Sequence, residues 1–291
     1  MNIFEQGCLI QLSVSKWGGV KKLSKDQIAK MVENGNTDWV SATKKLVDPE
    51  SLKPICKVTN TARSWLASIS LPFPIPGMVF VPRDLIERVD ETLSQYRSEF
   101  WGKVNAFQQD YAWLREKARL YLGELFNEVD YPLDIEKPFS FAWRFVILDV
   151  PNGNTRILAP EVYEREKEKF IQTMEEARGM AIEALREEFA QMVERISDRF
   201  TTGPDGKPKV FKNSTVQSFY EYFETFRDRN IFQDEALSEL VDQAQRVLSG
   251  RSAEEIRNNQ NLREQIRQNM ASIEETMGEV FNQPRRKIRI E

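Results

Sequence analysis

Apolar residues recur every three or four positions over two long stretches of the chain, and this period predicts two long amphipathic helices. At 1.5 Å per residue the first would be roughly 60–70 Å long. No proline interrupts residues 83–131, and a near-heptad spacing with one irregular step links Val89, Leu93, Tyr96, Phe100, Val104, Phe107, Tyr111, Leu114, Ala118, Tyr121 and Leu125. The second helix begins at Pro160 and ends at residues 202–204, and its stripe comprises Ile171, Met174, Ala181, Ile182, Leu185, Phe189, Met192, Ile196 and Phe200.

The period changes to two between these helices. Alternating residues predict a strand over 139–150, a turn at 151–154 and a short return strand at 155–158. Because the flanking helices have matched lengths, residues 83–201 are predicted to form a long antiparallel, coiled-coil-like helical hairpin with a small β element (132–159) inserted. Several stripe positions are aromatic, which favours a third packing element over a two-stranded coiled coil. The stripes would also suit contacts between copies of the chain.

Residues 1–82 are predicted to hold a strand, short helices and a proline-rich connector. The strand covers residues 8–15, and helices are expected at 25–33 (with Ser24 as its N-cap), 38–46 and 54–68. The run at 65–82 carries no charge, but its four prolines preclude a membrane-spanning helix.

The C-terminal segment, residues 210–283, is also predicted to be helical. Its helices are expected at 215–228, at 234–248, and from Ser252 onward, where Ser252 and Glu255 fit a capping box. Pro284 ends the last helix, and residues 284–291 form a basic tail. The fold is therefore expected to be mainly α.

Composition removes most catalytic chemistry. The chain has no histidine and two cysteines, Cys8 and Cys56, so neither a Ser-His-Asp triad nor a Cys- and His-ligated zinc site can form. No GxxxxGK[ST] phosphate loop occurs. We therefore expect a protein that is not an enzyme and that uses no metal or cofactor. Few cysteines and no secretory signal predict a soluble cytoplasmic protein without a membrane contact.

Two surfaces are candidates for binding. The connector would offer a protein-docking patch of Phe73, Ile75, Met78 and Phe80 if it is exposed, and would be a rigid packed element if it is buried. Nucleic acid would contact basic residues around an aromatic side chain and the basic tail. The candidates are Lys16, Trp17, Lys21, Lys22, Lys25, Arg285, Arg286, Lys287 and Arg289. The net charge of −4 argues against a chain that simply coats nucleic acid.

Three features in order resemble an uncharacterised protein family. They are SKWGGVKKLSKDQI (residues 15–28), the long helix, and VDYPLDIEKPFSFAWRFVIL (residues 129–148). The family consists of helical proteins from phages and integrative or conjugative elements, often encoded beside MoxR-type AAA+ ATPases and von Willebrand factor A-domain proteins. The resemblance covers about the first 200 residues. It implies a partner of an ATPase-driven machine and offers no catalytic residue.

The sequence thus leads to two functional hypotheses. The first is a non-enzymatic structural or adaptor protein, forming homo-oligomers, in a phage or mobile-element machine that includes an AAA+ ATPase or a von Willebrand factor A-domain protein. The second is a nucleic-acid-binding accessory factor in DNA processing or recombination.

Overall fold

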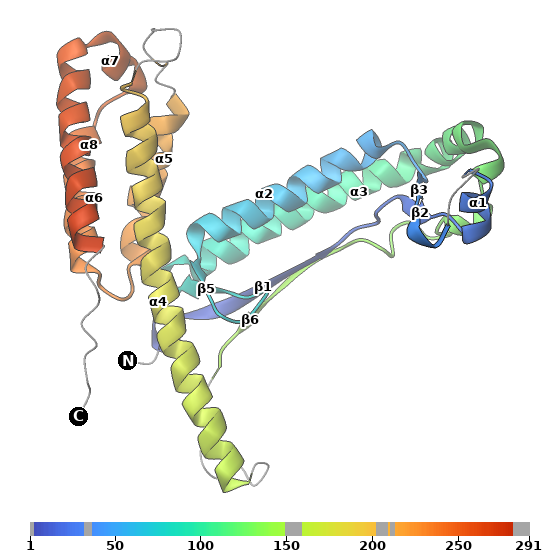
Figure 1. Cartoon of the computed structure of the whole chain (residues 1–291), viewed down its shortest axis with the longest axis horizontal. Coiled ribbons are helices and arrows are strands. Elements are labelled where there is room, and N and C mark those ends of the chain that lie inside the picture. Colours follow the sequence, from blue (N-terminus) through green and yellow to red (C-terminus); the bar gives the residue numbers. More distant parts are fainter. Residues whose placement is uncertain (1–2, 32–36, 149–158, 202–208, 210–212, 282–291) are drawn as a thin grey trace. The chain divides into compact units, whose positions relative to one another are not determined.

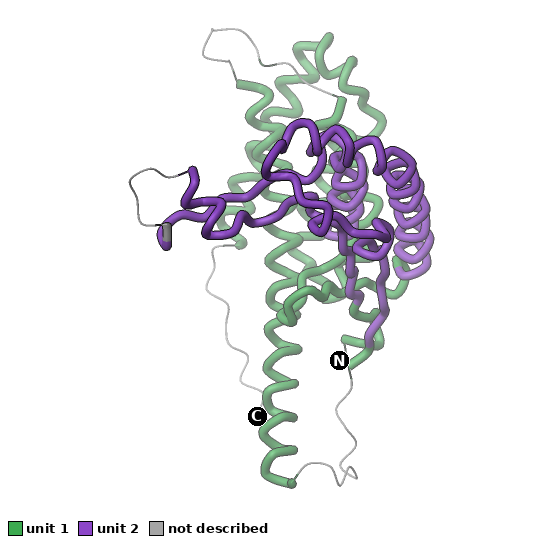
Figure 2. Tube along the Cα trace, turned by 90° about the vertical axis from the view of Figure 1, so that its right-hand side faces the viewer, with its two compact units in different colours: residues 1–9, 69–85, 147–291 green, residues 10–68, 86–146 purple. Residues whose placement is uncertain are grey.

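The computed structural model describes the fold of residues 3–31, 37–148, 159–201, 209 and 213–281 (Figure 1). The chain divides into two compact units, each assembled from segments that lie far apart in the sequence (Figure 2). Unit 1 comprises residues 1–9, 69–85 and 147–291, and unit 2 comprises residues 10–68 and 86–146.

Unit 1 is a helical bundle around the C-terminal half of α4 (Pro160–Asp198). This half packs against α5 (Asn213–Arg229) and α8 (Gln260–Phe281), and α6 (Glu235–Leu248) packs on α8. Tyr222 of α5 stacks on Phe189 of α4, with ring centroids 5.9 Å apart, and its hydroxyl donates to the Leu185 carbonyl at 3.1 Å. Burial raises the pKa of Tyr222. The predicted second stripe therefore lies in the core from Ala181 to Ile196.

The helix predicted from Ser252 onward is two helices. Ser252 forms the expected capping box with Glu255 at the start of α7 (Ala253–Asn258). Asn259 then adopts an extended conformation, and its side-chain oxygen accepts from the Leu262 N–H at 3.0 Å. This asparagine acts as the N-cap of α8, which explains the break that periodicity does not reveal.

The proline-rich connector forms a β-hairpin in unit 1. Strand β4 (Leu71–Pro72) pairs antiparallel with β5 (Val79–Pro82), and Gly77 in the turn has a φ of +79°. In the sheet, β5 is followed by β1 (Gly7–Ser15), and residues 7–9 of β1 belong to this unit. A Cβ atom on Gly7 would lie 2.2 Å from the Val81 carbonyl oxygen, so this pairing needs a glycine. Short 3₁₀ turns, η1 (Ile3–Glu5) and η4 (Arg83–Leu85), flank the strands.

Unit 2 is built on α3 (Ile86–Leu122), the predicted first long helix. In Figures 1 and 2 it lies beside α2 (Lys53–Ile69), and the rings of Trp65 and Tyr96 are 6.1 Å apart. Strand β6 (Ser140–Val146) pairs with β1 and packs on α3, with Phe141 5.5 Å from Phe100. The prediction is confirmed by the burial of Val89, Leu93, Phe100, Val104, Phe107, Tyr111, Leu114 and Ala118. Of the other stripe residues, Tyr96 and Leu125 are half-buried and Tyr121 is exposed.

Small elements complete unit 2. Strands β2 (Val20–Lys22) and β3 (Thr43–Lys45) pair antiparallel, and α1 (Lys25–Ala29) begins at the predicted cap, Ser24. The helix predicted over residues 38–46 is wrong: this segment holds the end of η2 (Thr37–Trp39) and then β3, because pairing with β2 satisfies its backbone. The remaining 3₁₀ turns are η3 (Pro49–Leu52), η5 (Gly123–Leu125) and η6 (Glu128–Asp130).

The mainly α architecture, with a small antiparallel sheet and a C-terminal helical segment, is confirmed. The antiparallel coiled-coil-like hairpin is not confirmed. Helix α3 belongs to unit 2 and α4 to unit 1, and each buries its stripe among elements of its own unit. The strand expected to reach residue 150 ends at Val146. The predicted turn and return strand, and the last two residues of the helix predicted over residues 25–33, lie outside the described residues.

The α3 stripe gives the first test. Phe107 is 4% exposed and contacts Trp17 and Phe139, so Phe107→Asp places a carboxylate in an aromatic core. We expect it to lower the free energy of unfolding by at least about 3–5 kcal/mol, measured by urea denaturation. Gln108→Asp, on the exposed side of the same helix, should change the stability little. Equal effects of the two variants would contradict the burial of the stripe.

A partly buried ion pair in unit 1 gives the second test. Asp234 accepts two hydrogen bonds from Arg186, at 2.6 and 3.0 Å, and also caps α6 through the Leu237 N–H. Asp234→Ala removes both interactions and should cost about 2–4 kcal/mol in thermal or urea unfolding. Asp234→Asn keeps a capping oxygen and should cost clearly less. The same loss in both variants would show that the cap contributes nothing.

Candidate functional site

The described residues hold no cluster of acids and thiols that suits a metal. Nowhere in this part of the chain do three or more Asp, Glu or Cys side chains converge on a point that could bind an ion. Nor does any helix described here combine the length and the apolar character that crossing a membrane requires. Exposed aromatic, apolar and charged side chains are the remaining candidates for a binding surface.

The β2–β3 ribbon carries four lysines in unit 2. Lys21 stands opposite Lys44, and like charges in such a pair repel unless an anion lies between them. Asp130 of η6 supplies that anion, 2.6 Å from Lys44 Nζ and 3.7 Å from Lys21 Nζ. Lys44 is buried, and its amine also donates to the Leu125 carbonyl at 2.5 Å. The charges on this face of the ribbon are therefore used in contacts that stabilise unit 2.

Most of the basic residues predicted to contact nucleic acid have partners within unit 2. Lys16 Nζ donates to Cys56 Sγ at 3.1 Å, Lys21 lies near Asp130, and Lys25 forms a 2.5 Å ion pair with Asp38. Lys22 is exposed and has no acidic partner among the residues that the structure describes.

Trp17 has a packing role. It lies against the rings of Phe107, at 6.1 Å, and Tyr111, at 5.8 Å. This half-buried ring is held by its neighbours rather than presented for stacking. The tail residues Arg285, Arg286, Lys287 and Arg289 lie outside the described residues.

The predicted docking patch is largely buried. Phe73 and Phe80 are only 6% and 1% exposed, and Phe80 packs 6.3 Å from Phe4. Ile75 and Met78 are half-buried at the hairpin turn. Because its two largest side chains are inside unit 1, the connector is a packed element, and these four residues do not together form an open surface.

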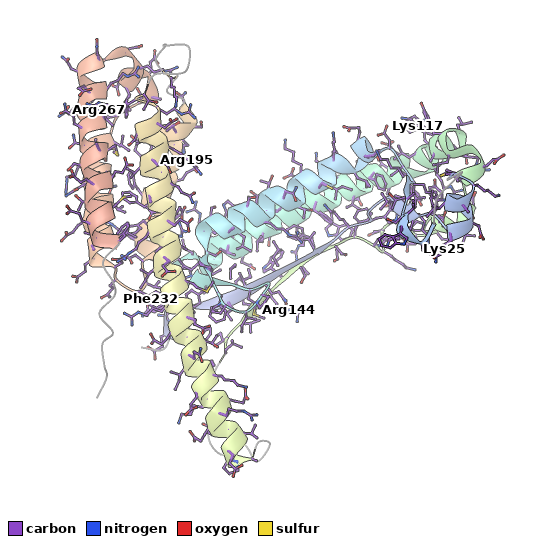
Figure 3. The ribbon with its side chains drawn as sticks, in the orientation of Figure 1. Lys25, Lys117, Arg144, Arg195, Phe232 and Arg267 are labelled. Carbon is purple, nitrogen blue, oxygen red and sulfur yellow. The ribbon has the colours of Figure 1, made fainter. Side chains whose placement is uncertain are left out.

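Sequence reasoning missed an aromatic surface at the end of α3. Trp113 and Tyr121 are 63% and 81% exposed, and Lys117 lies between them, with Nζ 5.4 and 5.9 Å from their ring centroids. Figure 3 labels Lys117 at this end of the helix. We call Trp113, Lys117 and Tyr121 the aromatic surface of α3. Their spacing of four residues was visible in the sequence, but Tyr121 had been assigned to the buried stripe.

A groove of about 490 Å³ runs between this surface and β3. The side chains that line it include Thr43, Lys45, Val47, Asp48, Lys117 and Tyr121, and we call it the β3 groove. Lys117 donates to Asp48 at 3.1 Å. The Glu50 N–H and the Lys117 amine hold the pKa of Asp48 below its ordinary value, so this pair is charged at neutral pH.

A second open surface lies on α4 in unit 1. All buried side chains of this helix lie at Ala177 or beyond, so residues 160–176 hold no buried side chain and most of them are exposed. Tyr163 and Phe170, seven positions apart, share one side of this segment and are half-buried, and Ile171 is 54% exposed. Figure 1 shows the same segment extending past the other helices of its unit.

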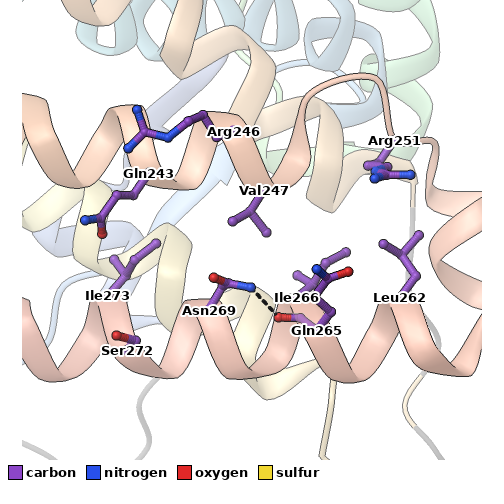
Figure 4. A pocket seen from close by; sticks show the side chains of 10 residues that line it. All are labelled: Gln243, Arg246, Val247, Arg251, Leu262, Gln265, Ile266, Asn269, Ser272 and Ile273. Atoms are coloured by element: carbon purple, nitrogen blue, oxygen red, sulfur yellow. Dashed lines mark hydrogen bonds between the residues drawn. The ribbon is translucent and has the colours of Figure 1, made fainter.

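The bundle of unit 1 also has a polar groove of about 500 Å³ between α6 and α8 (Figure 4). Arg246 and Arg251 lie on its α6 side, and the Asn269 side chain on α8 donates to the Gln265 carbonyl at 2.7 Å. Its polar groups satisfy one another or face solvent, and no buried unpaired group points into the described part of this groove.

Comparison with known proteins gives a match, and it covers about the first two thirds of the chain. A family model described as "Protein of unknown function (DUF3150)" matches residues 4–203, and the chain belongs to this family. The match covers nearly the same residues as the resemblance noted from the sequence and brings no activity with it. No curated protein and no solved structure matches the chain.

The Asp130 site gives the third test. Asp130→Asn leaves Lys44 buried without its carboxylate, so we expect a loss of about 3–5 kcal/mol in the free energy of unfolding, measured with urea. The control is Asp38→Asn, which removes the carboxylate of the exposed pair with Lys25 and should cost at most about 1 kcal/mol. Comparable losses would mean that burial does not distinguish the two pairs.

Proposed function

We propose that this chain is a non-enzymatic adaptor protein that self-associates and serves a phage or mobile-element machine, with an AAA+ ATPase or a von Willebrand factor A-domain protein as its partner. The observation that carries the adaptor role is the first half of α4, residues 160–176, which holds no buried side chain. The resemblance noted from the sequence supplies the class of partner.

This mostly exposed segment is suited to docking for two reasons. A helix of this length is marginal in water by itself, but residues 160–176 are continuous with a half that is packed in the bundle. The segment is therefore presented as a formed helix, which reduces the entropy lost on binding. Its aromatic side, with Tyr163 and Phe170, matches the helix-in-groove mode in which apolar side chains at helical spacing enter a partner's groove.

The charges of this segment support the same role. Lys167 pairs with Glu164 at 3.7 Å and Lys169 pairs with Glu166 at 2.8 Å, so both lysines are neutralised within the helix. Such exposed pairs contribute little to affinity. Binding would therefore depend on the aromatic side, and salt should affect it weakly.

The test uses two double variants with the same spacing on opposite sides of the helix. Tyr163→Ser with Phe170→Ser removes the aromatic side, and Arg165→Ser with Gln172→Ser changes the other side. We expect the first pair alone to abolish binding of the purified ATPase or A-domain protein encoded beside this chain, measured by calorimetry. Because no buried residue is altered, circular dichroism should show equal helix content in both.

Self-association is measured in the same preparations by light scattering. The proposal expects an oligomer of the wild-type chain. A wild-type chain that is monomeric and binds neither protein would overturn the proposal, and so would full binding by the Tyr163→Ser, Phe170→Ser variant.

A further inference from the structure

We infer that unit 2 carries a binding site for single-stranded nucleic acid, formed by the aromatic surface of α3 and the β3 groove. The inference goes beyond the adaptor role and depends on different residues. It also differs from the basic cluster expected from the sequence, in which Trp17 is packed and Lys21 and Lys25 have acidic partners.

The aromatic surface provides stacking faces. Trp113 and Tyr121 project from one side of α3 two turns apart, which places them roughly 12 Å from each other along the helix. Large rings that are 63% and 81% exposed have little packing role within the chain. Bases of any sequence can stack on such rings, because every base has a π-face.

The cations are placed for phosphates. Lys117 lies between the two rings, where the phosphate that links two stacked nucleotides would pass. On the other side of the groove, Thr43 and Lys45 of β3 line it. In the ribbon Val20 lies opposite Lys45 and Lys22 lies opposite Thr43, so Lys22 is on the same face of the ribbon as these two residues.

The charge balance favours a polyanion. Asp48 is the only carboxylate among the described residues that line the groove, and it is already bonded to Lys117. Lys22 and Lys45 therefore leave an excess of positive charge beside the rings. An apolar peptide would leave these amines without partners, whereas single-stranded nucleic acid supplies bases and phosphates together.

The experiment measures fluorescence anisotropy of a labelled twenty-nucleotide oligothymidylate with the full chain between about 50 and 200 mM salt. We expect Tyr121→Ala to weaken binding about fivefold to a hundredfold, the loss of one stacked base. Tyr121→Phe keeps the ring and should bind like the wild type. Leu133→Ala, another exposed residue of unit 2 but not one that lines the groove, should also be silent.

The lysines are tested with two triple variants of equal net charge. Replacing Lys22, Lys45 and Lys117 by Gln should reduce the slope of log affinity against log salt by about 2, since each phosphate contact contributes about 0.7. The matched control replaces Lys53, Lys57 and Lys103, which line a separate cavity of unit 2 between α2 and α3. This control should leave the slope unchanged.

Four outcomes would overturn the inference. They are no binding at 50 mM salt, wild-type affinity in Tyr121→Ala, equal loss in the two lysine triples, and competition by polyglutamate as effective as that by the oligonucleotide. The last result would assign the surface to an acidic peptide. None of them bears on docking at α4, since that test uses variants of residues 163 and 170.

Discussion

Burial of the apolar side of α3 is the constraint on which unit 2 depends. One helix meets α2 through Tyr96, β6 through Phe100, and Phe139, which precedes β6, through Phe107, so it joins the two layers. The stripe loses its cover after Ala118, where the helix still has another turn. That last turn exposes Tyr121, and the small elements around it supply lysines. The same periodicity that builds the core thus ends in a surface that solvent can reach.

Local signals in the sequence predicted the elements well. Stripes, caps and prolines located α2, α3, α4 and the capped start of α7, because each signal acts within a few residues. The prediction for residues 38–46 was wrong because the structure of this segment depends on a partner strand, β2, that lies about twenty residues away. The break between α7 and α8 was not predicted, because the apolar period is continuous there and the break depends on one side-chain hydrogen bond, from the Leu262 N–H to Asn259.

Which surfaces pack against which was harder to predict. The two long stripes match each other in length, and nothing in their periodicity shows that α3 pairs with α2 while α4 pairs with α5 and α8. The candidate sites were mispredicted for the same reason, because the periodicity does not show which side chains are covered by other elements. Phe73, Phe80 and Trp17 were proposed for binding because they are large and apolar. For the same reason Phe73 and Phe80 are buried and Trp17 packs half-buried against Phe107. Trp113 and Tyr121 differ from them in being exposed, and exposure depends on distant parts of the chain that a local sequence pattern does not show.

The two proposed surfaces differ in the charge of the unit that carries each. Unit 2 has 18 Lys and Arg against 16 Asp and Glu, whereas unit 1 has 23 against 29. An acidic unit would repel nucleic acid, so the phosphate-binding role belongs with unit 2 and the salt-insensitive docking helix with unit 1. Both surfaces lie within residues 4–203, the part that the family model matches, while α5 to α8 lie beyond it. The bundle helices therefore cover only the C-terminal half of α4, and the half that remains open belongs to the segment this chain shares with its family.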